Sequence, residues 1–317
     1  MAGVEGPLSA AETTRDAGMG PGAGALGQGM DAGAGVDGCV RADASSGTCA
    51  EASASGGAAP VILLHGFAQT PRSWDAVANA LRARGHEVHV PDLYVQVRPF
   101  SLDAACRRVA EIVRDVARAS GEPCAVAGYS MGGRIALETL ARAQAAGERL
   151  PLSALALEGA GLGPADEAAR EAFRARGDAW AADLRENGVA AFMDRWETLP
   201  LFASQRALSA DVRARVRSDR VAHDAEELAS SLTEAGQHCQ AGEADSLAAL
   251  ACAAECGVRV VYAHGSLDEK YGAVARRVAE LVPAARVECI AHAGHNVHLE
   301  QPEAFARVKV QRLLPRP

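Results

Sequence analysis

Lysine and long apolar runs are what this sequence most conspicuously lacks. Lysine occurs only at Lys270 and Lys309, so nearly all positive charge is arginine, whose planar fork suits carboxylates. No stretch approaches the roughly 18 consecutive apolar residues that mark a membrane-spanning helix. The start of the chain has neither a basic segment nor an apolar core. These absences argue against a membrane span and against a secretory signal.

The eight cysteines show no spacing typical of a zinc site. Cys252 and Cys256 form a lone pair, and Cys106, Cys124 and Cys289 stand in apolar surroundings that predict buried thiols. We therefore expect no metal. A large body without a secretory signal is typical of the reducing cytoplasm, where we place the protein. No pattern specifies an oligomeric state.

Composition divides the chain of 317 residues unevenly. The first 57 residues contain 14 glycines and 13 alanines but no Ile, Phe, Trp or Tyr. They cannot bury enough apolar surface to offset their backbone entropy, so we predict a disordered tail at 1–57 and a folded body at 58–317. Seven acids and two arginines give the tail −5 of the formal −8 charge. The mildly acidic body argues against a nucleic-acid-binding face, which would need a basic surface.

Strand-like and helix-like segments alternate along most of the body. The apolar run 60–64 is typical of a strand buried on both faces. Further strands are expected at 86–90, 124–127, 154–157, 258–263 and 286–290. Helices are expected at 73–84, 102–119, 131–145, 273–281 and 303–314. This alternation predicts an α/β fold with a mostly parallel sheet between helices. Residues 161–245 interrupt it with Ala-, Glu- and Arg-rich sequence, which predicts an inserted helical lid.

A nucleophile elbow follows one of the expected strands. The segment Gly128-Tyr129-Ser130-Met131-Gly132 lies between strand 124–127 and helix 131–145, which is the context that a G-x-S-x-G motif requires. Its glycines allow a sharp turn that exposes the Ser130 hydroxyl. We expect the backbone N–H groups of Met131 and of Phe67, after strand 60–64, to form an oxyanion hole.

An acid and a base are expected after later strands. Asp268 follows strand 258–263, with Glu269 as the alternative acid. His295 follows the glycine of a tight turn after the last strand, whereas His292 and His298 are interpreted as packing or loop residues. The order Ser130, Asp268, His295 is the one expected for a triad on an α/β-hydrolase fold.

Arg134 shares a helix face with Ser130, because it lies four residues further on. It could lean toward a substrate pocket, or it could be exposed or paired with Glu138. The segments 64–67 and 128–134 resemble the menaquinone-pathway 2-succinyl-6-hydroxy-2,4-cyclohexadiene-1-carboxylate (SHCHC) synthases, the MenH family. The lid segment 196–205 (WETLPLFASQ) and the segments 267–271 and 293–298 are similar to that family as well.

This resemblance implies an enzyme that eliminates pyruvate from 2-succinyl-5-enolpyruvyl-6-hydroxy-3-cyclohexene-1-carboxylate (SEPHCHC), a polycarboxylate, without a metal or an organic cofactor. Ser130 and His295 would remove a ring proton, and the oxyanion hole would stabilise charge that develops on the substrate carboxylate. The substrate-binding residues that the resemblance implies are Tyr129, Arg134, Arg174, Trp196 and Arg220. Arg176 is a possible substitute for Arg174.

The sequence also departs from the family pattern. His223 stands where the family usually has Asn or Gln, and 235–240 (AGQHCQ) replaces a Gly-Thr-Gly-x-Gln segment that is followed by an aromatic residue, with Leu247 near that aromatic position. A serine hydrolase acting on an ester or a carbon–carbon bond is the main alternative function. A non-catalytic binding protein would not need the intact elbow, acid and histidine.

The catalytic and binding residues named above all lie at or beyond position 67. We therefore predict that deleting residues 1–57 leaves catalytic turnover unchanged, as measured by steady-state kinetics of the full and truncated chains. A large loss of kcat in the truncated chain would contradict the interpretation of this segment as a tail.

Overall fold

The computed structural model describes residues 59–313, and side chains as far as residue 307. The expected tail at 1–57 lies outside the described residues. None of the helices within 59–313 combines the length and apolar character that crossing a bilayer requires.

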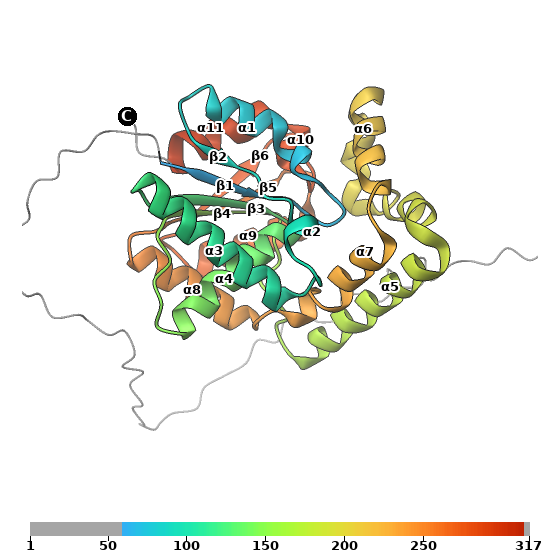
Figure 1. The fold of residues 1–317 in the computed structure, drawn as a ribbon, viewed down its shortest axis with the longest axis horizontal. Helices are drawn as coiled ribbons and strands as arrows, with labels where there is room; N and C mark the ends of the chain where they lie inside the picture. The colour runs from blue at the N-terminus through green and yellow to red at the C-terminus, as the bar shows by residue number, and fades with distance from the viewer. Residues whose placement is uncertain (1–58, 314–317) are drawn as a thin grey trace, which may run out of the picture.

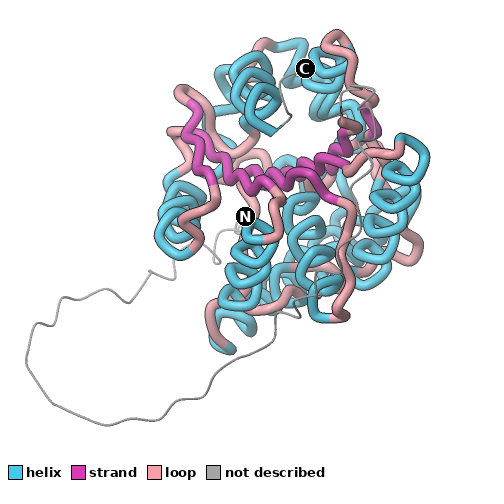
Figure 2. The backbone as a smooth tube through the Cα atoms, turned by 90° about the vertical axis from the view of Figure 1, so that its left-hand side faces the viewer, coloured by secondary structure: helices cyan, strands magenta, loops and turns pink. Residues whose placement is uncertain are grey.

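A six-stranded parallel sheet forms the centre of the fold, with the strand order β2-β1-β3-β4-β5-β6. The strands are β1 (Val61–Leu64), β2 (Val88–His89), β3 (Cys124–Tyr129), β4 (Leu152–Glu158), β5 (Arg259–Gly265) and β6 (Arg286–Ile290). Every residue of β1 and β3 is buried. Since helices cover both faces of the sheet (Figures 1 and 2), its central strands need apolar side chains on both sides.

Two helical layers enclose the sheet. On one face lie α1 (Asp75–Arg82), α10 (Val297–Glu300) and α11 (Pro302–Leu313), and on the other lie α3 (Leu102–Ser120), α4 (Met131–Ala145), α8 (Glu243–Glu255) and α9 (Glu269–Leu281). The boundaries of α3 have a local cause. Ser101 Oγ accepts a hydrogen bond from Ala104 N at the start of the helix, and Gly121 adopts a φ of 74° at its end.

A group of helices stands apart from the sheet layers, and Figure 1 shows it beyond the carboxyl ends of the strands. It consists of α5 (Glu167–Trp196), η2 (Pro200–Ala207), α6 (Ala210–Val221), α7 (Ala225–Thr233) and η3 (Gln237–Cys239). Helix α5 is interrupted at Gly188, whose φ of 75° is not helical. The following helix, α8, packs on α4 and β5 and so joins the sheet layers.

The structure confirms the predicted α/β fold and corrects some local expectations. The helix predicted at 73–84 begins as a 3-10 turn (Pro71–Trp74) before α1, and β2 contains only two residues. Helix α9 begins at Glu269 rather than near 273 because Asp268 caps it. Cys289 was expected to be buried but is exposed, because β6 is the last strand of the sheet and has a neighbour on one side only.

Close packing between α4 and β1 fixes where the elbow lies. A Cβ atom on Gly132 would stand 2.3 Å from the carbonyl oxygen of Leu64, and one on Gly272, inside α9, would stand 3.5 Å from its nearest neighbour. We predict that Gly132→Ala lowers the free energy of unfolding by about 1–3 kcal/mol through overpacking. Gly272→Ala is the matched control and should be neutral or slightly stabilising, because alanine favours a helix interior. Denaturant unfolding measures both, and equal stabilities would contradict this account of the elbow.

Candidate active site

The Ser130 hydroxyl stands at the turn between β3 and α4. Ser130 has a φ of 48°, which a residue with a side chain adopts only under constraint. The constraint comes from the glycines around it, because a Cβ on Gly128 would lie 2.6 Å from the backbone of Gly132 and Gly133. The sharp turn therefore depends on glycine at these positions, and it lifts the serine side chain out of the helix.

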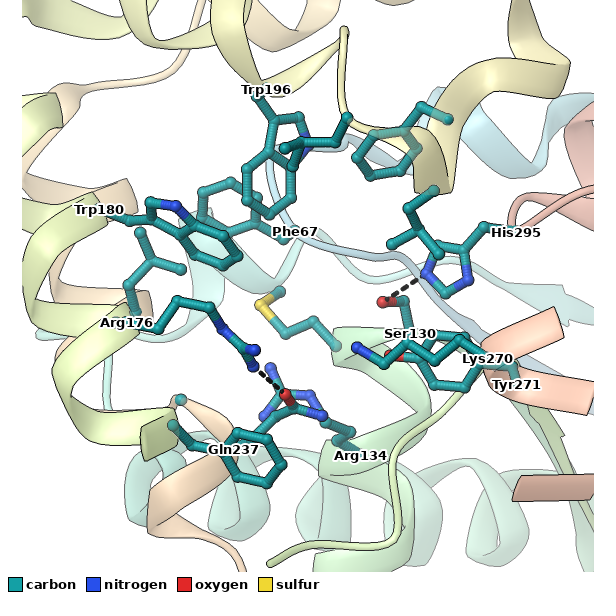
Figure 3. Close-up of a pocket in the computed structure, with 18 of the residues that line it drawn as sticks. Phe67, Ser130, Arg134, Arg176, Trp180, Trp196, Gln237, Lys270, Tyr271 and His295 are labelled. Atoms are coloured by element: carbon teal, nitrogen blue, oxygen red, sulfur yellow. Dashed lines mark hydrogen bonds between the residues drawn. The ribbon is translucent and has the colours of Figure 1, made fainter. Parts of the chain in front are cut away.

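Ser130, His295 and Asp268 are brought together at the carboxyl ends of three strands. The Oγ of Ser130 lies 3.2 Å from Nε2 of His295, as Figure 3 shows, and Nδ1 of His295 lies 2.9 Å from Oδ2 of Asp268. The other oxygen, Oδ1, accepts a hydrogen bond from the N–H of Tyr271 at the start of α9. The pair of His295 and Asp268 is buried. This arrangement suits proton transfer from serine to histidine.

The turn that carries His295 is held on both sides. Glu300 accepts a hydrogen bond from Gly294 N at 2.7 Å and one from Asn296 N at 3.3 Å. Burial raises the pKa of this carboxyl. The imidazole stacks on the ring of Tyr271, with centroids 4.6 Å apart. The imidazole of His295 therefore has little freedom to rotate away from Ser130.

The alternative residues lie elsewhere. His292 is exposed, and His298 is buried with its Nδ1 3.0 Å from the carboxylate of Glu158 and its ring stacked on Trp74. Glu269 lines the neighbouring cavity, whereas Asp268 is the carboxylate that accepts the hydrogen bond from His295.

Among the described residues, neither the backbone N–H of Phe67 nor that of Met131 has an acceptor. Both residues line the cavity that contains Ser130. On either side of Phe67 the backbone is fixed, since Gly66 N donates to Gln69 Oε1 at 3.0 Å and Ala68 N donates to the Tyr94 hydroxyl at 3.3 Å. Free donors on a fixed backbone are what an oxyanion hole requires.

A cavity of about 510 Å³ opens above Ser130 and reaches between the sheet layers and the separate helices. One wall is aromatic, where Trp196 contacts Phe67 (5.0 Å between ring centroids), Trp180 (4.8 Å) and Phe202 (5.6 Å). Phe173 and the segment Leu199–Leu201 add further apolar surface. Such a wall can cover a ring-shaped substrate and exclude water.

Three cationic side chains line the same cavity: Arg134, Arg176 and Lys270 (Figure 3). Arg134 Nη1 donates to the carbonyl of Ala235 at 3.0 Å, and Arg176 Nη2 donates to Gln237 Oε1 at 2.8 Å. Burial lowers the pKa of both guanidinium groups, and the charge of Arg176 adds to the effect on Arg134. Guanidinium groups stay protonated in proteins, so the cavity presents fixed positive charge with free donors for carboxylates.

Arg174 is not where the resemblance implied. Its side chain is exposed on α5 and pairs with Glu171, while Arg176 faces the cavity. The cause is helical phase. The cavity-lining residues of α5 are Phe173, Arg176, Gly177 and Trp180, which follow the i, i+3, i+4, i+7 pattern of one helix face. Arg174 lies off that face, so the substitute named from the sequence is the one that lines the cavity.

Arg220 and Tyr129 also lie outside the cavity lining. Arg220 is buried, donates to Glu197 Oε1 at 3.0 Å and to Gln205 Oε1 at 3.2 Å, and stands over the ring of Phe202. It therefore links α6 to the end of α5 and to η2, which carries Phe202 of the aromatic wall. Tyr129 is buried between His295 and His298, and its ring packs against both imidazoles.

Trp180, Gln237 and Lys270 line the cavity, although the sequence did not predict them as site residues. Lys270 lies two residues after Asp268, in the first turn of α9, so its position close behind the expected acid was the available signal. Gln237 belongs to the segment that departs from the family pattern, and here it supplies the partner of Arg176. His223, the other departure, packs beside Tyr94, and burial lowers its pKa. Leu247 is buried in α8, away from the cavity lining.

Comparisons with known proteins show what the chain resembles. Residues 61–308 match the alpha/beta hydrolase family. A Bacillus subtilis (strain 168) protein provisionally named SHCHC synthase is 32% identical over 257 residues, covering 78% of this chain and 88% of its own length. SHCHC synthase from Salmonella paratyphi C (strain RKS4594) is 30% identical over 255 residues, covering 78% and 90%.

Solved structures give the same picture. MenH from S. aureus aligns with a TM-score of 0.70 at 25% identity, covering 80% of this chain and 93% of its own. A thermophilic esterase from Thermogutta terrifontis shares the fold, with a TM-score of 0.62 at 22% identity over 80% and 88% of the two chains.

The two neighbouring arginines of α5 allow a direct test of the cation cluster. Arg176→Gln should weaken the binding of a small dicarboxylate such as succinate about tenfold or more, because a charge-assisted hydrogen bond is lost from a half-buried site. Arg174→Gln removes the same charge from the exposed face and should leave the Kd unchanged. Calorimetric titration measures both, and a reversed order would mean that Arg174 faces the ligand.

Proposed function

Because the chain belongs to the alpha/beta hydrolase family, we propose that its triad and cationic cavity serve as an SHCHC synthase of menaquinone (vitamin K2) biosynthesis. The reaction is the elimination of pyruvate from SEPHCHC, which makes the enzyme a carbon–oxygen lyase. One observation carries the proposal: a serine–histidine base and three cationic side chains share one cavity with an aromatic wall. Relatives named SHCHC synthase support it.

The proposed proton transfer begins at the base. His295 accepts the hydroxyl proton of Ser130, and Asp268 keeps the imidazole in the tautomer that has Nδ1 protonated. The serine oxygen removes a ring proton. The electron pair of the broken C–H bond passes into the ring and forms a new double bond as the bond to the enolpyruvyl oxygen breaks. The leaving enolpyruvate takes up the proton that His295 holds and becomes pyruvate, which returns Ser130 and His295 to their starting protonation states.

Charge that develops on a substrate oxygen would lie against the N–H groups of Phe67 and Met131. Donors that are already oriented cost no reorganisation when the charge appears, and removing one such donor typically costs about 10²–10³ in kcat. Arg134, Arg176 and Lys270 would hold the carboxylates, with Trp196 beside the ring. Orientation by several charged contacts lowers the entropic part of the barrier.

The proposed chemistry is complete without a metal or an organic cofactor, because each step is a proton transfer or a bond cleavage within the substrate. A small polycarboxylate substrate is consistent with work in the cytoplasm. We expect no nucleic acid partner.

A serine hydrolase is the second candidate, because the same triad and free N–H donors also fit attack on an ester. The two functions make different demands on the cavity. Ester hydrolysis uses the serine oxygen as a nucleophile and gains little from three cations. Elimination from a polycarboxylate needs the cations and forms no acyl-enzyme.

The decisive assay supplies SEPHCHC and a nitrophenyl ester to the same protein and follows pyruvate and nitrophenol. We expect rapid pyruvate release that Ser130→Ala reduces by several orders of magnitude. Ester turnover without pyruvate release would overturn the synthase proposal. Normal pyruvate release by Ser130→Ala would remove Ser130 from the mechanism.

Arg134 is the sharpest test of carboxylate binding within this reaction. Arg134→Ala should lower kcat/KM for SEPHCHC about 100-fold, since a buried charge-assisted contact contributes roughly 1.5–3 kcal/mol. Arg118→Ala, an exposed arginine on α3 paired with Asp115, is the control and should be neutral. Full activity of the Arg134 variant would show that this side chain binds no part of the substrate.

A further inference from the structure

Tyr94 lies behind the oxyanion loop (residues 65–69, which include Phe67). It takes no part in the function proposed above. It stands on the short helix α2 (Leu93–Gln96), where Asp92 Oδ1 accepts the backbone N–H groups of Tyr94 and Val95. The phenol ring is buried and packs against Phe100 and His65. Burial raises the pKa of the phenol to about 12, so the hydroxyl keeps its proton at neutral pH.

The hydroxyl of Tyr94 meets three parts of the molecule at once. It accepts a hydrogen bond from Ala68 N at 3.3 Å, lies 3.2 Å from Ser231 Oγ, and lies 3.7 Å from the sulfur of Met131. Ala68 follows Phe67, Met131 follows Ser130, and Ser231 belongs to α7. Met131, one expected oxyanion donor, contacts the hydroxyl itself. Phe67, the other expected donor, is the chain neighbour of Ala68, which also contacts the hydroxyl.

The directions of these hydrogen bonds follow from the number of protons. Ser231 Oγ donates its only proton to the carbonyl of Leu228 at 2.8 Å. It must therefore accept from Tyr94, whose oxygen in turn accepts from Ala68 N. This forms a directed chain from the oxyanion loop through Tyr94 to α7. If α7 withdraws, the sulfur of Met131 is the remaining acceptor for the phenol proton.

Ala68 gives this chain mechanical importance. Its φ of 51° places a residue with a side chain in the left-handed region, which costs energy unless the surroundings hold it there. Gln69 holds the N–H of Gly66, one residue before Phe67, and the Tyr94 hydroxyl holds the N–H of Ala68, one residue after it. Without the hydroxyl, Ala68 N loses its acceptor and the loop can relax toward an ordinary φ. The free N–H of Phe67 would then turn.

Ser231 links the chain to the cavity, since it is buried and also lines the substrate space. A ligand that presses α7 against the sheet layers would strengthen the contact between Ser231 and Tyr94. We propose that Tyr94 is a positioning residue that sets the oxyanion hole through Ala68 and couples it to the seating of α7. This proposal rests on the proposed function for the identity of the natural substrate. Its hydrogen-exchange test does not depend on that function.

Tyr94→Phe removes only the hydroxyl and is the central variant. We expect kcat for SEPHCHC to fall about tenfold, less than the 10²–10³ for losing an oxyanion donor outright, with KM changed less than about twofold. A merely structural role would lower stability and leave kcat of the folded enzyme unchanged. Ser231→Ala should lower kcat less, and the double variant should match Tyr94→Phe alone, because both changes break one chain.

Tyr262→Phe is the matched control. Tyr262 is equally buried, and its hydroxyl donates to the carbonyl of Ala160 at 2.7 Å, away from the oxyanion loop and α7. It should lose comparable stability and keep its kcat. An equal loss of kcat in both variants, or an unchanged kcat in Tyr94→Phe, would overturn the proposal.

Two further readouts separate this proposal from the proposed function. If the wild-type protein releases no pyruvate but cleaves a nitrophenyl ester, the same variants are compared on the ester, whose oxyanion needs the same N–H groups. Amide hydrogen exchange needs no substrate at all. Tyr94→Phe should speed exchange at Ala68 about tenfold or more relative to Tyr262→Phe, because its acceptor is gone. Unchanged protection at Ala68 would contradict the role of the hydroxyl.

Discussion

The carboxylate of Asp268 connects the fold to the end of the cavity that holds Ser130 and His295. One oxygen receives the N–H of Tyr271 and so begins α9, and the other holds Nδ1 of His295. Because α9 begins there, Lys270 reaches the cavity and Tyr271 stacks on the imidazole. Substitution of Asp268 would therefore disturb His295, Lys270 and the start of α9 together. The other part of the site is Ser130, which the close packing of the glycines around its turn holds next to His295.

The character of the cavity follows from two opposite environments in one space. Aromatic rings from β1's loop, α5 and η2 exclude water, which strengthens every electrostatic contact inside. Arg134, Arg176 and Lys270 supply charge that an apolar ester would not use. This combination favours a compact, ring-shaped polycarboxylate over a neutral ester, although the same triad geometry would serve both reactions. The fold alone does not choose between them.

Features that depend on short stretches of sequence were predicted better than features that depend on packing between distant segments. The elbow and the strand ends carry Ser130, Asp268 and His295, whose positions depend on short segments, and the structure brings these residues together. Arg174 was misplaced because helical phase changes by about 100° per residue, so a small error of alignment turns a side chain away. Arg220 and Tyr129 depend on contacts between segments far apart in sequence. Tyr94 gave no signal, since its hydroxyl matters only where three such segments meet.

Under the proposed function, the Ser130 oxygen loses its proton to His295, removes a proton from the substrate and forms no covalent bond to it. Intact-protein mass spectrometry during turnover of SEPHCHC, with rapid acid quenching, tests this most directly. The account predicts pyruvate release while the protein retains its unmodified mass at every time point. Accumulation of a covalent adduct that maps to Ser130 and decays at the rate of turnover would contradict it.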